Sequence, residues 1–231
     1  MPRGAFILLE GVDRCGKTTQ AKKLVEYLSQ SGKAELLRFP DRTTSIGQMI
    51  NSYLTSATDL DDKAIHLLFS ANRWEAVSKM RELMASGTTL VVDRYSYSGV
   101  AFSASKEGMD VDWCMAPEVG LPAPDGVIFL DLTVEKSMAR GAFGDERYEK
   151  EGMQRVVREN FFALMGGQAA GQSPWHVLDA DKTIEELHAE VRELGETIRT
   201  AARDAPVGTL AWEPGLGAGA GAAAAPPAPA S

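Results

Sequence analysis

The feature that most constrains the fold is a glycine-rich loop at residues 11–18. Its sequence, GVDRCGKT, has the spacing G-x-x-x-x-G-K-[ST] and lies between an apolar run at residues 5–10 and a helical pattern at residues 17–30. Glycines let such a loop curl until its N–H groups surround phosphate oxygens, and the following helix adds its positive N-terminal end. Lys17 would then reach the β- and γ-phosphates, and the Thr18 hydroxyl would hold Mg²⁺. A chance match would lack the flanking strand and helix, so the loop predicts a nucleoside-triphosphate site.

Four further apolar segments continue the alternation of strands and helices. They lie at residues 34–39, 88–93, 126–132 and 175–180, and helical patterns such as residues 184–203 lie among them. Strand–helix alternation is typical of a parallel sheet, and continuous apolar runs are typical of strands buried on both faces. We therefore expect an α/β fold in which helices cover both faces of a five-stranded parallel sheet.

The composition changes after about residue 213. Residues 214–231 are rich in Ala, Pro and Gly and include no charged, aromatic or β-branched residue. Such a segment has almost nothing to bury, so we expect a disordered tail after a single domain at residues 1–213. A partner-binding role for this tail stays open.

Charge and composition limit the partners that we expect. The chain has 24 Lys and Arg against 32 Asp and Glu, and its net charge of −8 argues against binding to nucleic acid or an anionic membrane. No apolar run is long enough for a signal core or a membrane span. Cys15 and Cys114 form no CxxC pair and fit free thiols in a reducing compartment. We therefore expect a cytoplasmic protein, with nuclear or mitochondrial pools left open.

Arginines near the predicted strand ends indicate what the triphosphate is used for. Arg42 follows the second strand, Arg94 follows Asp93 at the end of the third, and Arg73 lies on a helical stretch. Ligands of open parallel sheets bind outside the carboxyl ends of the strands, so these cations should face the phosphate loop. Phosphoryl transfer needs positioning and charge stabilisation, which arginines and Mg²⁺ supply. The chain also lacks the Asn-Lys-x-Asp motif of regulatory GTPases, so a small-molecule kinase is favoured.

These residues belong to a wider pattern that resembles eukaryotic-type thymidylate kinases. The pattern runs through EGVDRCGKTTQ, ELLRFPDRTT, LLFSANRWE, LVVDRYSYSGVAFS, DWCMAPEVGLPAPD and RGAFGDERYE, and it covers about residues 5–212. The resemblance implies a P-loop NTPase-type fold with a short lid segment at about residues 141–148. It also implies ATP- and Mg²⁺-dependent phosphorylation of dTMP to dTDP, a step in dTTP synthesis, by a homodimer.

The resemblance further implies a role for individual residues. Asp13 would accept a hydrogen bond from the deoxyribose 3′-hydroxyl, and the ring of Tyr95 would disfavour a ribose 2′-hydroxyl. Phe69 would stack on thymine and Arg73 would bond its O4. The implied catalytic residues are Lys17, Arg14, Arg94 and Asp93, and the implied Mg²⁺ ligands are Thr18 and Asp93. The implied ATP-binding residues are Gly11, Arg14, Cys15, Gly16, Lys17, Thr18, Thr19, Arg140, Arg147, Asp181 and Lys182. The implied dTMP-binding residues are Asp13, Phe39, Arg42, Phe69, Arg73, Arg94, Tyr95, Ser98, Gly99, Phe102, Tyr148 and Gln154.

Several of these residues also have a structural interpretation. Phe69 and Arg73 are four apart and share one helix face, but a Phe among leucines is more often part of a core. Charged loops such as residues 141–148 are usually solvated, and Asp93 could cap the next segment. For the whole protein, two alternatives stay open: a broader pyrimidine monophosphate kinase that accepts dUMP or UMP, and a nucleotide-binding protein that has lost catalysis.

Cys15 lies within the phosphate loop, next to the predicted start of a helix. A helix N-terminus can make a thiol more reactive. We therefore expect alkylation of Cys15 to inhibit the protein and ATP to protect it.

Overall fold

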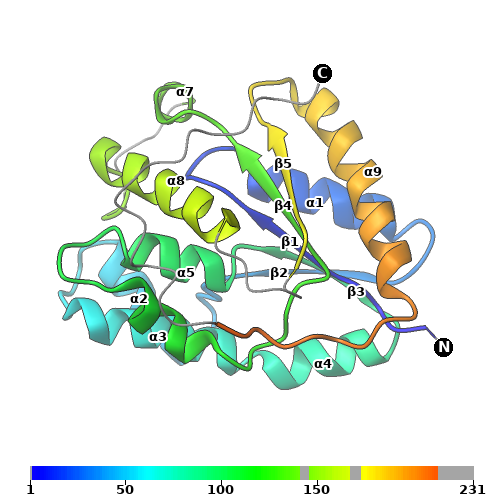
Figure 1. The fold of residues 1–231 in the computed structure, drawn as a ribbon, viewed down its shortest axis with the longest axis horizontal. Helices are drawn as coiled ribbons and strands as arrows, with labels where there is room; N and C mark the ends of the chain where they lie inside the picture. The colour runs from blue at the N-terminus through cyan, green and yellow to red at the C-terminus, as the bar shows by residue number, and fades with distance from the viewer. Residues whose placement is uncertain (1, 141–145, 167–172, 213–231) are drawn as a thin grey trace.

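The computed structural model describes residues 2–140, 146–166 and 173–212, and its centre is a parallel sheet. Five strands run in the order β2-β3-β1-β4-β5, as Figure 1 shows. Each strand begins and ends within one residue of a segment predicted from the sequence, so the predicted α/β fold is confirmed. The strands are β1 (Phe6–Glu10), β2 (Ala34–Arg38), β3 (Thr89–Asp93), β4 (Gly126–Asp131) and β5 (Trp175–Asp179).

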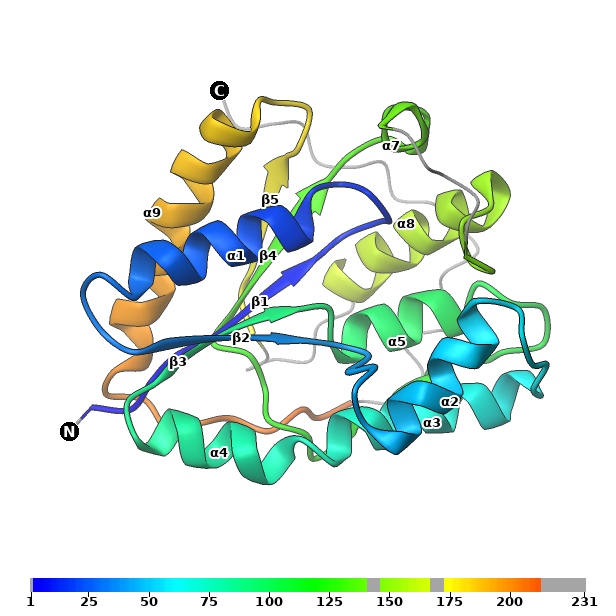
Figure 2. The same ribbon diagram turned by 180° about the vertical axis from the view of Figure 1, so that it is seen from behind.

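Helices cover both faces of the sheet, again as predicted. Two helices, α1 (Lys17–Leu28) and α9 (Ile184–Ala202), pack together on one face of the sheet. Figure 2 shows them with the molecule turned by 180° from the view of Figure 1. Among the described residues, no helix is long and apolar enough to cross a membrane. The remaining helices are α2 (Ser45–Leu54), α3 (Asp62–Trp74), α4 (Val77–Ala85), α5 (Ser96–Ser103), α6 (Val111–Met115), the 3₁₀ helix η1 (Ala116–Glu118), α7 (Val134–Ala139) and α8 (Glu151–Gly166).

The central strand β1 divides the core into two parts. Side chains alternate along a strand, so Phe6 and Leu8 join the cluster under α2–α5 and α8, while Ile7 and Leu9 join the cluster under α1 and α9. All four side chains have no exposed surface. Burial on both faces explains why β1 is a continuous apolar run in the sequence.

The connections at β1 place its carboxyl end at the point where the strand order changes direction. After β1 the chain forms β2 and β3 on one side of it, and after β3 it crosses to form β4 and β5 on the other side. Leu9 is paired with Asp93 of β3 and with Ile128 of β4. Parallel strands end at the same edge, so the segments after β1, β3 and β4 begin close together. This edge is where open α/β sheets bind ligands.

The first turns of the helices differ in how they are capped. Thr44, Asp61 and Thr183 each accept a hydrogen bond from a first-turn N–H of the helix that follows. The cap of α1 is Gly16, which has a φ of 104° and no side chain to bond those groups. The N–H groups at the start of α1 are therefore left for an external acceptor.

The segment after α9 crosses the molecule and joins the opposite side of the fold. Ala123 donates its N–H to the carbonyl of Gly208 at 2.9 Å, and Leu210 donates to Leu121 at 2.8 Å. Trp212 donates its indole N–H to Asp112 at 2.7 Å. The chain therefore packs as part of the domain up to residue 212. Residues 213–231, which include the predicted tail, lie outside the described residues, so its disorder stays a prediction.

A partly buried carboxylate anchors the first strand, and its removal tests the fold. Asp125 accepts hydrogen bonds from the Phe6 N–H at 2.7 Å and from Arg3 Nη1 at 2.8 Å and Nη2 at 2.5 Å. Because these are hydrogen bonds to a charged group, Asp125→Asn should lower the free energy of unfolding by about 2 kcal/mol. Glu185→Gln, which changes an exposed pair with Lys23, should shift it by less than about 0.5 kcal/mol. Urea titration measures both, and equal effects would contradict the anchoring role.

Candidate active site

The phosphate loop connects β1 to α1 and keeps its conformation through two glycines. Gly11 has a φ of 145°, and a Cβ there would lie 2.6 Å from the Leu130 carbonyl oxygen. Gly16 also has a positive φ. Lys17 is 5 % exposed, and its ammonium group donates to the Val12 carbonyl at 2.6 Å. The lysine therefore curves back over the loop, where a phosphate bound to the loop would meet it.

The loop forms one wall of a cavity of about 690 Å³. Side chains from α3 and α5 form the wall opposite, and Glu146, Tyr148 and Glu149 border the cavity just before α8. Ala180 and residues 182–184, after β5, border the end beyond the phosphate loop. One cavity thus reaches from the loop to two separate regions, which is the arrangement that a donor nucleotide and an acceptor need.

Two oxygen ligands lie together at the start of α1. The Thr18 hydroxyl donates to the Asp93 carboxylate at 2.5 Å, and Asp93 is 1 % exposed. A hydroxyl and one carboxylate suit Mg²⁺, which keeps several waters and binds substrate phosphates instead of a full protein cage. No cluster of three or more His, Cys, Asp or Glu side chains that could hold a metal occurs among the described residues. The donor set therefore fits a magnesium ion that is carried largely by phosphates.

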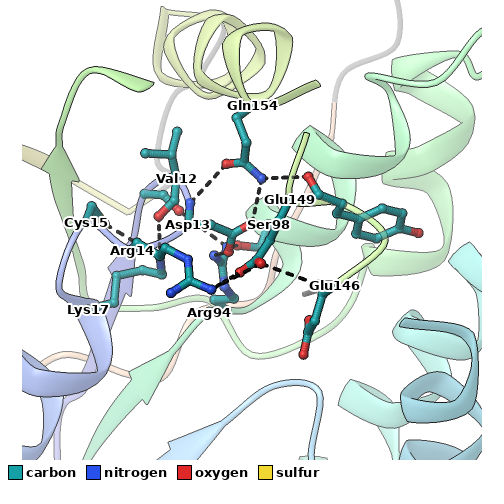
Figure 3. A network of polar contacts seen from close by, with 12 residues as sticks. Val12, Asp13, Arg14, Cys15, Lys17, Arg94, Ser98, Glu146, Glu149 and Gln154 are labelled. Atoms are coloured by element: carbon teal, nitrogen blue, oxygen red, sulfur yellow. Dashed lines mark hydrogen bonds and ion pairs between the residues drawn. The ribbon is translucent and has the colours of Figure 1, made fainter. Parts of the chain in front are cut away.

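Asp13, in the middle of the loop, is held from two sides (Figure 3). Gln154 of α8 accepts from the Asp13 N–H at 3.0 Å and donates to its carboxylate at 2.5 Å. Arg94 donates to the other carboxylate oxygen and to the Ser98 hydroxyl, the latter at 2.9 Å. Burial lowers the pKa of Arg94, but the charges of Asp13 and Glu10 among others outweigh this effect and raise it. Arg94 is therefore a permanent cation beside the loop.

Two more arginines are paired with carboxylates of the segment before α8. Arg14 Nη2 donates to the two carboxylate oxygens of Glu149 at 2.9 and 3.1 Å (Figure 3). Arg42 Nη2 donates to Glu146 at 2.7 Å. Both pairs border the cavity, so the same guanidinium groups can bind a phosphate if the carboxylates move aside.

Glu10 fixes the start of α5 against the end of β1. Its carboxylate has no exposed surface and accepts from the N–H of Tyr95, the N–H of Ser98 and the Ser98 hydroxyl, at 3.0, 3.1 and 2.5 Å. Burial raises the pKa of Glu10, and the bonds from Ser98 and the charge of Arg94 oppose this shift. Because Ser98 also bonds Arg94, Glu10 sets the position of that arginine indirectly.

Aromatic side chains and one arginine surround the end of the cavity under α3 and α5. Phe69 and Phe102 lie 6.5 and 5.8 Å from the ring of Tyr148, measured between ring centroids. Tyr95 has no exposed surface and packs on Phe6 and Phe39. Arg73 borders this end as well and is bonded to Glu118. A flat ring with polar edges, such as a nucleobase, fits between these groups.

Comparison with known proteins identifies the family. The family model described as thymidylate kinase matches residues 9–191. This chain belongs to the thymidylate kinase family. The thymidylate kinase of Danio rerio is 52 % identical over 209 residues, which are 90 % of this chain and 97 % of that protein. The human thymidylate kinase is 50 % identical over the same shares of the two chains. A solved thymidylate kinase from Candida albicans superposes with a TM-score of 0.82 and 35 % identity, covering 91 % of this chain and all of that one.

Most of the side chains that the sequence singled out meet at this cavity of a thymidylate kinase fold. The structure brings residues from several separate regions of the chain to its surface, although their individual roles stay predictions. The predicted residues that line it are Asp13, Arg14, Cys15, Gly16, Lys17, Thr18, Thr19, Phe39, Arg42, Phe69, Arg73, Asp93, Arg94, Tyr95, Ser98, Gly99, Phe102, Arg140, Tyr148 and Lys182.

Four predicted residues do not line the cavity. Gly11 is the first residue of the loop. Gln154, which has no exposed surface, bonds Asp13. Arg147, predicted to bind ATP, stacks 4.1 Å from the ring of Tyr53 and bonds the Tyr53 carbonyl at 3.0 Å. Asp181, also predicted at the ATP site, pairs with Lys136. Arg147 therefore packs against α2, and Gln154 supports Asp13 from outside the cavity. Most of the predicted lid, residues 141–145, lies outside the described residues.

Some residues of the site escaped the prediction. Glu10, Glu118, Glu146 and Glu149 all bond site residues, but carboxylates are common and their partners are distant in sequence. The signal for Glu10 was present, since an acid that ends a fully apolar strand must have buried partners. No local pattern distinguishes the other three.

The burial of Cys15 argues against the expected reactivity of its thiol, which stays a prediction. Its side chain borders the cavity but has no exposed surface, and it packs in the core under α1 and α9. Cys114 is buried too. A reagent therefore needs a local opening of the loop before it reaches the Cys15 sulfur.

Thiol labelling measures this burial. In native protein, both cysteines should react with a small disulfide reagent at least about tenfold more slowly than in denaturant, because thiolate attack requires access. Ellman-type absorbance with mass spectrometry measures the rate at each site. Rapid native labelling of Cys15 with loss of activity that ATP prevents would support the original expectation instead.

Proposed function

We infer that this protein transfers the γ-phosphoryl group of ATP to dTMP, giving dTDP and ADP, a step in dTTP synthesis. The observation that carries this inference is the shared cavity. A phosphate loop borders its centre and an aromatic pocket with one arginine borders one end, in a chain of the thymidylate kinase family. A donor triphosphate on the loop and a monophosphate whose base enters the aromatic pocket would meet between the two.

Charge stabilisation explains the transfer step. The attacking atom is an oxygen of the acceptor's own phosphate, which is already ionised near neutral pH, so no general base is required. It forms a new bond to the γ-phosphorus while the bond to the β-phosphate oxygen breaks, and ADP leaves. Lys17, Arg14 and Arg94 all border the cavity and would stabilise the charge that spreads over the transferred group.

Thr18 and Asp93 would hold the magnesium ion. Bound there, Mg²⁺ supplies neutralisation of the charge on the triphosphate. Asp93 is also 3.7 Å from Arg38, so its carboxylate is held between a cation and a hydroxyl. Both interactions hold the Asp93 carboxylate in place beside the start of α1.

The two nucleotides would bind at separate regions. At the donor end, Arg140 donates to the Ala180 carbonyl at 2.6 Å, which places its guanidinium beside Lys182 and the segment before α9, where adenine would lie. At the acceptor end, Phe69 would stack on thymine. Arg42 would release Glu146 and bind the acceptor phosphate in its place.

A homodimer and a cytoplasmic location stay predictions from the sequence and its family. Four of the exposed large apolar side chains support the homodimer, since they lie on α2, on α3 and next to η1, and α3 contacts both α2 and η1. Such a surface fits an interface with a second copy. The residues are Met49, Leu67, Trp74 and Val119.

A coupled ADP-release assay tests the function. With ATP and Mg²⁺, turnover should be strongest on dTMP among dTMP, dUMP, UMP, dCMP and AMP. Lys17→Ala should lower it about 100-fold or more, because the loop then lacks its cation. Preference for UMP or AMP would support phosphoryl transfer as the reaction but contradict dTMP as the acceptor. Bound ATP without turnover on any acceptor would favour a protein that has lost catalysis.

Tyr95 tests the broader alternative of a kinase that accepts ribonucleotides. Its hydroxyl is buried and has no hydrogen-bond partner among the described residues, so Tyr95→Phe should keep the stability and the dUMP-to-UMP activity ratio. Tyr95→Ala removes the ring that would block a 2′-hydroxyl and should raise UMP activity relative to dUMP, with a loss of stability of about 3 kcal/mol. A changed ratio in Tyr95→Phe would assign discrimination to the hydroxyl.

A further inference from the structure

Arg73 and Glu118 form a different kind of ion pair from the others around the cavity. Arg73 Nε donates to Glu118 at 2.7 Å and Nη2 at 2.5 Å, and the two side chains are 3 % and 0 % exposed. The side chains of the Arg42–Glu146 pair are 36 % and 35 % exposed. A ligand phosphate can reach Arg42 and replace its carboxylate, but it cannot reach Glu118. Arg73 therefore keeps Glu118 as its partner when a ligand binds.

Gly99 of α5 closes a second side of the same guanidinium. A Cβ at this position would lie 2.5 Å from Arg73 Nη2 and 3.0 Å from its Cζ. The guanidinium thus occupies the space that any other side chain at position 99 would fill. Its position is set by a carboxylate at one edge and by the helix backbone at another.

Glu118 is itself fixed by the helix that carries Arg73. The carbonyl of Pro117 accepts hydrogen bonds from the Ser70 hydroxyl at 3.0 Å and from the Trp74 indole N–H at 2.7 Å. Ser70, Arg73 and Trp74 all belong to α3. The 3₁₀ helix η1 is therefore attached to α3 on both sides of Arg73, so the two partners form one unit.

The pairing determines which ligand group Arg73 can recognise. The two bonds to Glu118 use two of the five N–H donors of a guanidinium and leave Nη1 for the cavity that Arg73 lines. The pair as a whole is neutral, so it does not attract an anion as a free guanidinium would. A fixed, neutralised donor suits an uncharged carbonyl oxygen and rejects a group that itself carries N–H donors.

We propose that Glu118 is a positioning residue for base recognition: it neutralises and orients Arg73, with room left by Gly99, so that Arg73 donates to a pyrimidine carbonyl and rejects an amino group there. This inference rests on the proposed function, because it takes a pyrimidine monophosphate as the acceptor. It explains why an acidic residue outside the cavity is buried completely.

Steady-state kinetics of Glu118→Gln on dTMP and dCMP test the proposal. The amide places a donor against the guanidinium, so kcat/KM for dTMP should fall about tenfold or more. The dTMP-to-dCMP ratio should fall with it, while the KM for ATP stays unchanged. Glu118→Asp keeps the charge and should recover part of the ratio. Asp125→Asn breaks a partly buried arginine pair outside the cavity and should leave the ratio unchanged.

Gly99→Ala gives a second route that keeps both charged side chains of the ion pair and serves if Glu118→Gln does not fold. Its Cβ should displace the guanidinium and lower the dTMP-to-dCMP ratio in the same way. Gly152→Ala, where a Cβ meets nothing within 4 Å, is the matched control. In the double variant of Arg73→Gln with Glu118→Gln, the ratio should equal that of Arg73→Gln alone, because Glu118 acts through Arg73.

The outcomes separate the proposal from the function it rests on. An unchanged ratio in folded Glu118→Gln or Gly99→Ala, with normal dTMP activity in the unsubstituted protein, would overturn the role of Glu118 alone. Additive effects in the double variant would also overturn it. Absence of dTMP turnover in the unsubstituted protein would overturn the proposed function and this inference together.

Discussion

The parallel pairing of β1 with β3 and β4 is the constraint on which the rest of the site depends. Leu9 lies between Asp93 and Ile128, and the N–H of Arg94 donates to the Leu9 carbonyl at 3.1 Å. This register brings the phosphate loop, the acid at the end of β3 and the arginine after it to one edge. A slip of one residue would turn each of these side chains to the opposite face.

Charge balance is the second organising feature of the cavity. Three arginines around the phosphate loop are matched by carboxylates: Arg14 by Glu149, Arg42 by Glu146 and Arg94 by Asp13. Without these carboxylates, the arginine side chains gathered at the cavity would repel one another, so the pairing stabilises the fold. Because two of these carboxylates belong to the segment before α8, the position of that segment and the charge available to a phosphate are linked.

The arginines of the cavity differ in burial, and burial decides whether an arginine can exchange its carboxylate partner for a phosphate. The exposed pairs can give up a carboxylate to a phosphate, whereas Arg73 stays with Glu118 inside the protein. The same residue type thus serves two purposes in one cavity: charge stabilisation where water enters, and directional hydrogen bonding where it does not. The broad substrate specificity attributed to the Candida albicans thymidylate kinase is a property of that protein. In this chain, the geometry around Arg73 is the place where acceptor selectivity would be set.

Local patterns in the sequence determined the sheet, the phosphate loop and most of the residues that line the cavity. Strand burial, glycine spacing and helix starts depend on neighbours a few residues apart, and such short-range features are visible in a linear chain. The resemblance to thymidylate kinases supplied Tyr95 and the stacking role of Phe69, which helical spacing among leucines alone would place in a core.

Only the tertiary structure decided which charged groups meet. Gln154 bonds Asp13 across 141 residues of sequence, and Glu118 bonds Arg73 across 45. It also placed Arg147 against Tyr53 and buried Cys15. Polar partners of this kind are selected by packing and by the cost of burying a charge alone, which depend on the whole fold and leave no periodic trace along the chain.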